Sequence, residues 1–363
     1  MKYVSEKDFQ EYVKTHPDRC FVTYKQDVFD MTNFLEDHPG GDKFIQDQNG
    51  KDITQLFHGP EPHSHSKSAF RMMGQYKIGE LTYYDSSTDA GSNSSDTYPK
   101  IDDNYIYYNG FKMDRNQGLI PQTLGLNKQQ YLEFVHQPLH LDNVMLFKWK
   151  FFEFFTRNKW WYIPLVWVPI SFAVLAFGIV TNFGSEDTNR FDKYIYVESP
   201  SFNVLGPLLG FLWGMFMWTF IEYMLHRYLF HMSETLLNFK AFRYIHFMVH
   251  GIHHIIPMDP DRLVFPPPLA AVLAIGIYPM FVAGYGGNFA RVSFAGGLFM
   301  YILYDYFHWW LHHGKGGLNY FKELKRYHNL HHYFDEDAGY GITSKLWDYV
   351  FFTVIKEGKK KAE

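Results

Sequence analysis

Cysteine is nearly absent from this sequence, because Cys20 is the only one among 363 residues. A single cysteine excludes an internal disulfide framework and any metal cluster held by several thiolates. A strong excess of one charge is also missing, since 34 basic and 38 acidic residues leave a net charge of −4. Proteins that bind nucleic acid through phosphate contacts present a basic surface, so this balance argues against a nucleic-acid partner.

The N-terminal end lacks the apolar core of a secretory signal. Charged side chains are spread through residues 1–16, and no continuous hydrophobic stretch interrupts them. A secretory signal needs such a stretch ahead of its cleavage site. We therefore expect the N-terminal end to stay in the cytosol.

Hydrophobic residues are abundant, at 47%, and they are concentrated in runs that alternate with polar segments. A transmembrane helix needs about 20 predominantly apolar residues. The alternative, buried helices of a large soluble core, rarely requires several runs of this length. The sequence predicts four spans, at about 162–181, 204–222, 267–286 and 291–311. With four spans, the polar segments 223–262 and 312–363 fall on the same side of the membrane as the N-terminus.

The predicted organisation is multidomain. Residues 1–84 alternate short β-rich runs, at 21–24 and 27–30, with short amphipathic stretches, which indicates a small α+β domain. Residues 85–100 are mostly small and polar and are expected to form a flexible linker. Residues 101–363 are expected to form an all-α membrane domain with a cytosolic histidine-rich cap, preceded by irregular structure and short helices near the membrane surface.

Two histidines of the first domain are candidate haem ligands. His38 precedes a proline and two glycines, which let the backbone turn sharply and approach a flat ligand. His65 lies before an amphipathic stretch, and His63 and His58 are alternatives for the same role. Two imidazoles on opposite faces fill both axial positions of haem iron, so the haem carries electrons and does not bind O₂.

Residues 1–84 resemble a cytochrome b5 domain. The fingerprint of that family is His-Pro-Gly-Gly followed by a second histidine in a His-Ser-x-x-Ala setting, which matches His38 and the residues around His65. The resemblance implies haem b held by these two histidines, with His63 as the runner-up and His58 as a distant third.

Ten further histidines lie in four clusters at metal-ligand spacing. Positions i, i+3 and i+4 of a helix share a face, so each cluster except the first presents at least two imidazoles in a common direction. The five-residue spacing of the first cluster is poor on a regular helix and predicts that its helix ends near His231. The clusters are His226 and His231; His250, His253 and His254; His308 and His312; and His328, His331 and His332.

Ten imidazoles exceed the needs of one ion, whereas two metal ions at about four to six ligands each account for them. Imidazole ligands without thiolates suit iron, zinc or copper. Zinc can bind here in a purified sample, but it has no redox chemistry. A tethered haem domain on the same side as a metal pair, at roughly millimolar local concentration, indicates a reaction that consumes electrons. Iron with O₂ as co-substrate is the natural match, and the membrane spans imply a substrate that arrives from the bilayer.

The membrane part, with residues 131–138 ahead of its first span, resembles the fatty acid hydroxylase superfamily of membrane di-iron proteins. With its haem domain, the whole chain resembles the fatty acid 2-hydroxylases of that superfamily. The resemblance implies an O₂-dependent oxidoreductase of the monooxygenase type that hydroxylates carbon 2 of a long or very-long-chain acyl group, free or in ceramide. It also implies an NAD(P)H-dependent cytochrome b5 reductase as partner, the ten histidines as metal ligands, and no catalytic residue beyond them.

Lys360 and Lys361 look like a dilysine retrieval signal, which predicts a multi-pass protein of the endoplasmic-reticulum membrane with both termini cytosolic. Two other histidines, His246 and His313, fall outside the spacing patterns and are expected to be structural. Glu222 and Asp305 lie one turn from candidate ligands and are candidates for orienting them, although for Glu222 an ordinary helix-end role is as good an explanation.

Three other functions remain open on sequence grounds. A front-end acyl desaturase also fuses cytochrome b5 to histidine clusters, but it has glutamine where this sequence has His328. A sterol or sphingoid-base oxidase of the same superfamily is disfavoured by the fused haem domain and by residues 131–138. A haem electron carrier whose histidines hold structural zinc belongs to a different functional class.

Overall fold

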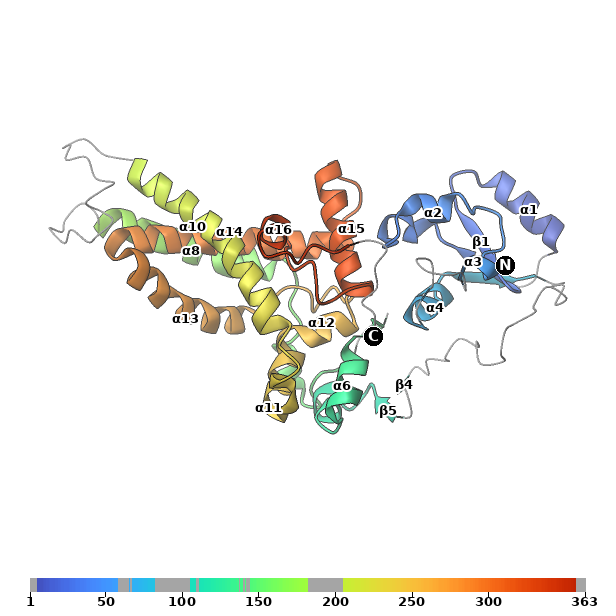
Figure 1. The fold of residues 1–363 in the computed structure, drawn as a ribbon, viewed down its shortest axis with the longest axis horizontal. Helices are drawn as coiled ribbons and strands as arrows, with labels where there is room; N and C mark the ends of the chain where they lie inside the picture. The colour runs from blue at the N-terminus through green and yellow to red at the C-terminus, as the bar shows by residue number, and fades with distance from the viewer. Residues whose placement is uncertain are drawn as a thin grey trace.

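The chain forms a small mixed domain and a larger helical part, shown at opposite ends of Figure 1. The structure is a computed structural model, and it describes residues 5–57, 65, 67–81, 105–108, 111–136, 138, 139, 141, 144–181 and 205–356. The expectations for His58, His63, the linker at 85–100 and the dilysine pair fall outside the described residues.

The N-terminal domain is built on a three-stranded antiparallel sheet in the order β1-β2-β3. Its strands are β1 (Phe21–Tyr24), β2 (Asp27–Asp30) and β3 (Lys77–Glu80). The first two coincide with the predicted β-rich runs. The helices are α1 (Glu6–Thr15), the 3-10 helix η1 (Thr32–Asp37), α2 (Asp42–Gln46), α3 (Thr54–Phe57) and α4 (Lys67–Gly74).

Alternate residues of these strands pack on opposite faces of the sheet, as the pleat requires. Phe21 and Val28 contact Phe9 of α1 on one face. Val22 and Phe29 belong to a second cluster, which is completed by Met31, Phe34, Phe57 and Met73. This second cluster contains α3 and α4, the helices on either side of His65, so the sheet supports the candidate haem pocket.

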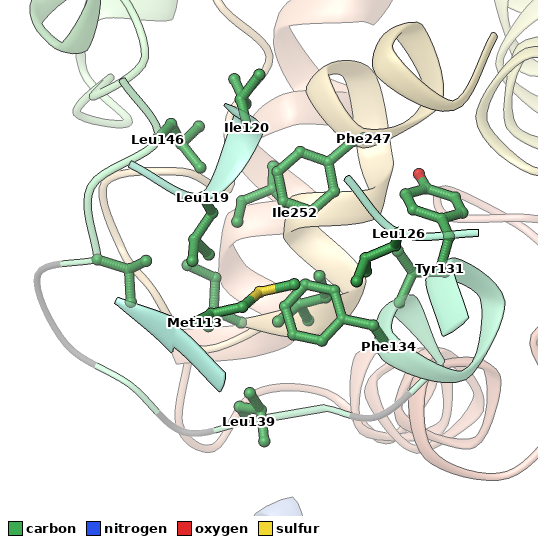
Figure 2. Packing of buried hydrophobic residues seen from close by; sticks show 14 of the residues in the cluster. Met113, Leu119, Ile120, Leu126, Tyr131, Phe134, Leu139, Leu146, Phe247 and Ile252 are labelled. Carbon is green, nitrogen blue, oxygen red and sulfur yellow. The ribbon is translucent and has the colours of Figure 1, made fainter. Parts of the chain in front are cut away.

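A middle region joins the two parts of the chain. It contains an antiparallel hairpin of β4 (Tyr105–Tyr108) and β5 (Phe111–Asp114), followed by α5 (Leu119–Thr123), α6 (Lys128–Val135) and α7 (Lys150–Phe154). Short helices were expected here, whereas the hairpin was not, because its two runs lie among many charged residues and asparagines. Figure 2 shows Met113, Leu119 and Phe134 packed against Phe247 and Ile252. The middle region therefore supports the helices that carry the second histidine cluster.

Four long helices form the apolar bundle in Figure 1. They are α8 (Tyr162–Thr181), α10 (Leu205–Met224), α13 (Pro267–Tyr285) and α14 (Gly287–His313). Helix α14 packs closely against α10 because glycines line their contact. A Cβ added to Gly214 would lie 1.7 Å from the Ser293 carbonyl oxygen, and one added to Gly296 would lie 2.0 Å from that of Phe211. Small residues at such positions let helix backbones approach within the membrane.

Three of these helices are long and apolar enough to cross a membrane: Tyr162–Val180, Leu205–Phe230 (α10 with its continuation) and Pro267–Tyr285. Only 22%, 22% and 11% of their apolar windows are buried within the protein, so their remaining surface requires lipid. Helix α14 has sufficient length but a more polar composition, and the fourth span remains a prediction. The chain is a multi-pass membrane protein.

The remaining helices gather at one end of the bundle (Figure 1). They are the π-helix η3 (Leu225–Phe230), the 3-10 helix η4 (Leu236–Asn238), α11 (Lys240–His246), the π-helix η5 (Phe247–Gly251), α12 (Ile252–Ile255), α15 (Asn319–Tyr333) and α16 (Leu346–Val350). The two polar segments that follow α10 and α14 thus meet at the same end. Helix α15 contacts η1 of the N-terminal domain through side chains of both elements.

Candidate metal centre and haem pocket

All ten histidines selected from the sequence come together in two groups of five. In each group the candidate ligand atoms lie within 4.8 Å of one another. Nine of the ten side chains are buried, and His231 is partly exposed. We call them group one and group two. Group one is His226, His231, His250, His254 and His331, and group two is His253, His308, His312, His328 and His332.

A π-helical turn explains the five-residue spacing of the first cluster. The His231 N–H donates to the His226 carbonyl at 3.0 Å, which is the i to i+5 bond of a π turn. Residues five apart are brought to one side by such a turn, so both rings join group one. The helix ends at Phe230, in agreement with the prediction from the spacing.

The two His-x-x-His-His clusters each contribute to both groups. On α12 and the π turn before it, His250 and His254 join group one while His253 joins group two. Successive helical residues are rotated by about 100°, so adjacent histidines cannot point into the same site. The ring centroids of His254 and His332 lie 4.3 Å apart. The two groups are therefore immediate neighbours.

Backbone carbonyls orient two histidines of group one. His226 Nδ1 lies 2.6 Å from the Tyr340 carbonyl oxygen, and His331 Nδ1 lies 2.7 Å from that of Ala338. A carbonyl oxygen can only accept, so each Nδ1 carries the hydrogen and each Nε2 presents a lone pair. The sequence clusters did not indicate the 338–340 segment, whose role depends on its tertiary position. The glycine between the two carbonyls, Gly339, has φ +75°, which favours this residue.

Hydrogen bonds alone do not explain the close contacts between ring nitrogens within the two groups. His328 Nε2 lies 3.1, 2.8 and 3.0 Å from the Nε2 atoms of His308, His312 and His332. One ring nitrogen has either one hydrogen or one lone pair, so at most one of these contacts is a hydrogen bond. Both ring nitrogens of His253 are buried without a hydrogen-bond partner among the described residues. A cation at the centre of each group would use the lone pairs that otherwise oppose one another.

Burial keeps these rings in the neutral form that metal ligation needs. Desolvation, with repulsion from neighbouring imidazoles, lowers the pKa of His250, His253 and His254 well below its ordinary value. The same causes lower the pKa of His328 and His332. The donor set therefore fits two metal ions.

The haem pocket places His38 and His65 opposite each other. Their ring centroids are 6.3 Å apart and their planes differ by 23°. Two imidazole nitrogens that shared one metal ion would be about 4 Å apart, since each metal–nitrogen bond is about 2 Å long. The ring centroids would lie farther apart than the nitrogens, so the observed separation of 6.3 Å leaves room for one ion between the rings. His38 Nδ1 donates to the Gly41 carbonyl at 2.8 Å, which leaves Nε2 for a metal. A Cβ on Gly40 would lie 2.8 Å from the His38 ring. The pair fits a haem.

An apolar cavity of about 400 Å³ adjoins the histidines, with His250, His253, Asp305 and His308 in its wall. Aliphatic and aromatic side chains form most of the rest. Its outer residues Phe152, Phe155 and Val272 are 44%, 45% and 63% exposed, so the cavity reaches the surface between α7 and α13. A narrower cavity of about 50 Å³ continues between α10, α13 and α14 and shares Phe230, Phe265 and Tyr304 with the first.

Comparisons with known proteins identify a family for each of the two parts of the chain. Residues 5–82 match the cytochrome b5-like heme/steroid binding domain, and residues 211–353 match the fatty acid hydroxylase family. The ceramide very long chain fatty acid hydroxylase of Saccharomyces cerevisiae is 34% identical over 98% of this chain and 95% of its own length. This chain belongs to the cytochrome b5-containing fatty acid hydroxylases.

Two further relatives support this family membership. The fatty acid 2-hydroxylase of Homo sapiens is 33% identical over 93% of this chain and 92% of its own length. A solved structure of full-length Scs7p, in which only the hydroxylase domain is visible, matches with a TM-score of 0.59 and 33% identity over 69% of this chain and 88% of that chain. The family match identifies an oxidoreductase and favours the hydroxylase interpretation over the desaturase and carrier alternatives.

In this hydroxylase the candidate orienting carboxylates have other partners. Glu222 Oε1 accepts from the Thr343 N–H at 3.0 Å and from its hydroxyl at 2.7 Å, which joins α10 to the segment after α15. Asp305 Oδ1 accepts from the Phe265 N–H at 3.3 Å. No hydrogen bond joins either carboxylate to a group-one or group-two histidine within the described ranges. The orienting role assigned to them from sequence falls instead, for His226 and His331, to the 338–340 carbonyls.

The two histidines outside the patterns stay outside both groups. His246 Nδ1 lies 2.7 Å from the Tyr131 hydroxyl, which also donates to the Arg243 carbonyl at 3.1 Å. Since the hydroxyl hydrogen goes to the carbonyl, Nδ1 of His246 donates to the hydroxyl oxygen. This bond ties α6 to α11, just before the second cluster, and it gives His246 a structural function. The ring of His313 lies 5.4 Å from that of Trp309.

Proposed function

We propose that the protein hydroxylates carbon 2 of long or very-long-chain fatty acyl groups of sphingolipids, using O₂ and electrons that pass through its own haem domain. One observation carries the proposal: two adjacent groups of buried, neutral histidines adjoin an apolar cavity that reaches the outer surface of the bundle. The fused cytochrome b5-like domain supplies the electron carrier that an oxygenase needs.

In this proposal each histidine group holds one metal ion through imidazole nitrogens. Iron at both positions would supply the redox chemistry with O₂ that zinc lacks. The 338–340 carbonyls hold His226 and His331 in the tautomer that directs Nε2 inward. His38 and His65 would hold the haem, which would supply one-electron transfer without binding O₂.

The cavity positions the acyl chain. Its apolar walls exclude water and bind methylene groups, and His253 and His308 in the wall bring the metal positions next to the reactive end. Entry occurs from the bilayer between α7 and α13. Trp149, Phe151 and Phe154 of this region are 69%, 69% and 71% exposed, as suits aromatic residues at a membrane interface.

The remaining parts of the proposal concern cellular context. Electrons come from NAD(P)H through a cytochrome b5 reductase, the protein resides in the endoplasmic-reticulum membrane, and both termini are cytosolic. Parity of four spans and the dilysine sequence support this orientation. Asn93-Ser94-Ser95 is an N-glycosylation sequon, and in this orientation it should remain unglycosylated because it lies in the cytosol. A change of gel mobility after glycosidase treatment would contradict the orientation.

Lipid mass spectrometry tests the activity. Cells that lack their own 2-hydroxylase should accumulate 2-hydroxy acyl chains in ceramide when they express the wild type. The His253→Ala variant should produce none, whereas Tyr228→Phe, an exposed surface change, should match the wild type. Absence of hydroxylated lipid from a wild-type protein with intact haem and metals would favour the electron-carrier alternative.

A further inference from the structure

The haem domain lies against α15, the helix that carries three candidate metal ligands (Figure 1). Asp37, the last residue of η1, forms an ion pair with Lys325 at 2.6 Å between Oδ1 and Nζ. The side chains are 23% and 7% exposed, so the pair is largely removed from water and is screened less than a surface pair. Lys325 Nζ also donates to the carbonyl of Gly314, the residue that follows α14, at 2.7 Å, which holds the ammonium group in place.

Two more hydrogen bonds surround this ion pair. The Asn329 side-chain amide donates to the Asp37 carbonyl at 3.2 Å, and Asn329 is itself buried. At the exposed rim, the Gly316 N–H donates to Glu36 Oε2 at 3.2 Å. The acidic end of η1 therefore meets complementary donors on the hydroxylase part.

The position of these contacts along the chain gives them a functional meaning. Asp37 immediately precedes His38, a candidate haem ligand, and Asn329 immediately follows His328, whose Nε2 lies within 3.1 Å of three group-two nitrogens. The hydrogen bond from Asn329 to Asp37 thus directly joins the neighbour of a candidate haem ligand to the neighbour of a candidate metal ligand.

We propose that the Glu36–Asp37 rim and the Lys325–Asn329 face of α15 form the docking surface on which the haem domain delivers electrons to group two. This inference rests on the proposed function. His38 and His65 would hold the haem that gives up one electron at a time, the two histidine groups would hold the metal ions that accept it, and NAD(P)H through the reductase would supply the electrons that reduce the haem again.

Zero-length cross-linking tests the docking without reference to activity. A carbodiimide joins a carboxylate and an amine that are in contact, so the full-length protein in lipid nanodiscs should yield a peptide joined through Asp37 and Lys325. Asp37→Asn and Lys325→Met should each abolish this product. Glu11→Gln removes one charge from an exposed position on α1 and should leave the yield unchanged.

Haem oxidation tests the electron route. After reduction by NADH and reductase, the wild-type haem should reoxidise rapidly when O₂ and lipid are added. Asp37→Asn and Lys325→Met should each slow this step roughly fivefold, the factor that corresponds to losing a partly buried ion pair of about 1 kcal/mol. Haem spectrum and metal content should be unchanged, and Glu11→Gln should reoxidise at the wild-type rate.

The outcomes separate the two proposals. Absence of the Asp37–Lys325 cross-link, or wild-type reoxidation in both variants, overturns the docking surface. If Asp37→Asn disturbs the haem spectrum, Lys325→Met decides alone, because Lys325 lies outside the haem domain. A wild-type protein that cross-links but forms no hydroxylated lipid refutes the proposed function and leaves the docking intact.

Discussion

Replacing Tyr131 with phenylalanine tests whether the middle region stabilises the metal centre. The ring of Tyr131 is 1% exposed and fills the cluster in Figure 2, so Tyr131→Phe keeps the packing and removes only the hydroxyl. That hydroxyl is hydrogen-bonded to His246 Nδ1 and to the Arg243 carbonyl. Both partners are left without it in a buried site.

The magnitude follows from the cost of unpaired buried groups. Each of the two unpaired groups costs about 1–3 kcal/mol, so the variant should lose at least about 2 kcal/mol of stability, or about 4 °C or more in Tm. Thermal unfolding of the purified, metal-loaded protein measures this, with metal content followed along the same ramp. We expect metal release at a lower temperature because α11 leads directly into the second histidine cluster.

Tyr228→Phe is the matched control, since it also removes one hydroxyl and Tyr228 is 59% exposed. It should shift Tm by less than about 1 °C. Equal Tm values for Tyr131→Phe and wild type would refute the argument that this hydrogen bond stabilises the site. A lower Tm with metal release at the wild-type temperature would show that the bond stabilises the fold but not the metal centre.

Three further predictions concern the sites, pH and helix packing. His65→Ala should remove the haem spectrum and leave metal bound, whereas His253→Ala should lower metal content and leave the haem; if each variant loses both, the two-site assignment is wrong. Burial, with a smaller contribution from His136, lowers the pKa of His246 to about 4, against about 6.5 when unfolded. The stabilising contribution of His246 is therefore present above about pH 6.5 and lost toward pH 4, because between these values only the unfolded state binds the proton. Between pH 7 and 5 the free energy of unfolding of the wild type should fall by about 2 kcal/mol more than that of His246→Asn, measured by denaturant unfolding at each pH. An equal fall in both proteins would contradict this. Gly214→Ala should destabilise the bundle by about 2 kcal/mol in thermal unfolding, because its Cβ would lie 1.7 Å from the Ser293 carbonyl oxygen. Gly276→Ala is the control, since no atom lies within 4 Å of its added carbon. Equal Tm values for the two variants would refute the packing argument.

Local chemistry explains why much of the fold was predictable. Strands β1 and β2 lie where β-rich runs were identified, because their valine and aromatic residues favour extended backbone. The ends of α8 and the beginning of α13 coincide with predicted span boundaries, since apolar runs of this length have one stable conformation in lipid. The hairpin of β4 and β5 was missed although Asn109-Gly110 separates two β-rich runs, because the many charged residues and asparagines around these runs indicated irregular structure.

The sequence by itself determined which residues are candidate ligands, because residue type and helical spacing are local properties. Its ten clustered histidines all reach the two groups. Only the tertiary structure decided how they divide, since His253 and His254 are neighbours in the chain but point into different groups. It alone brought the 338–340 carbonyls to His226 and His331, and Asp37 to Lys325 across 288 residues of chain. Such contacts depend on how distant helices pack, and no local pattern records that packing.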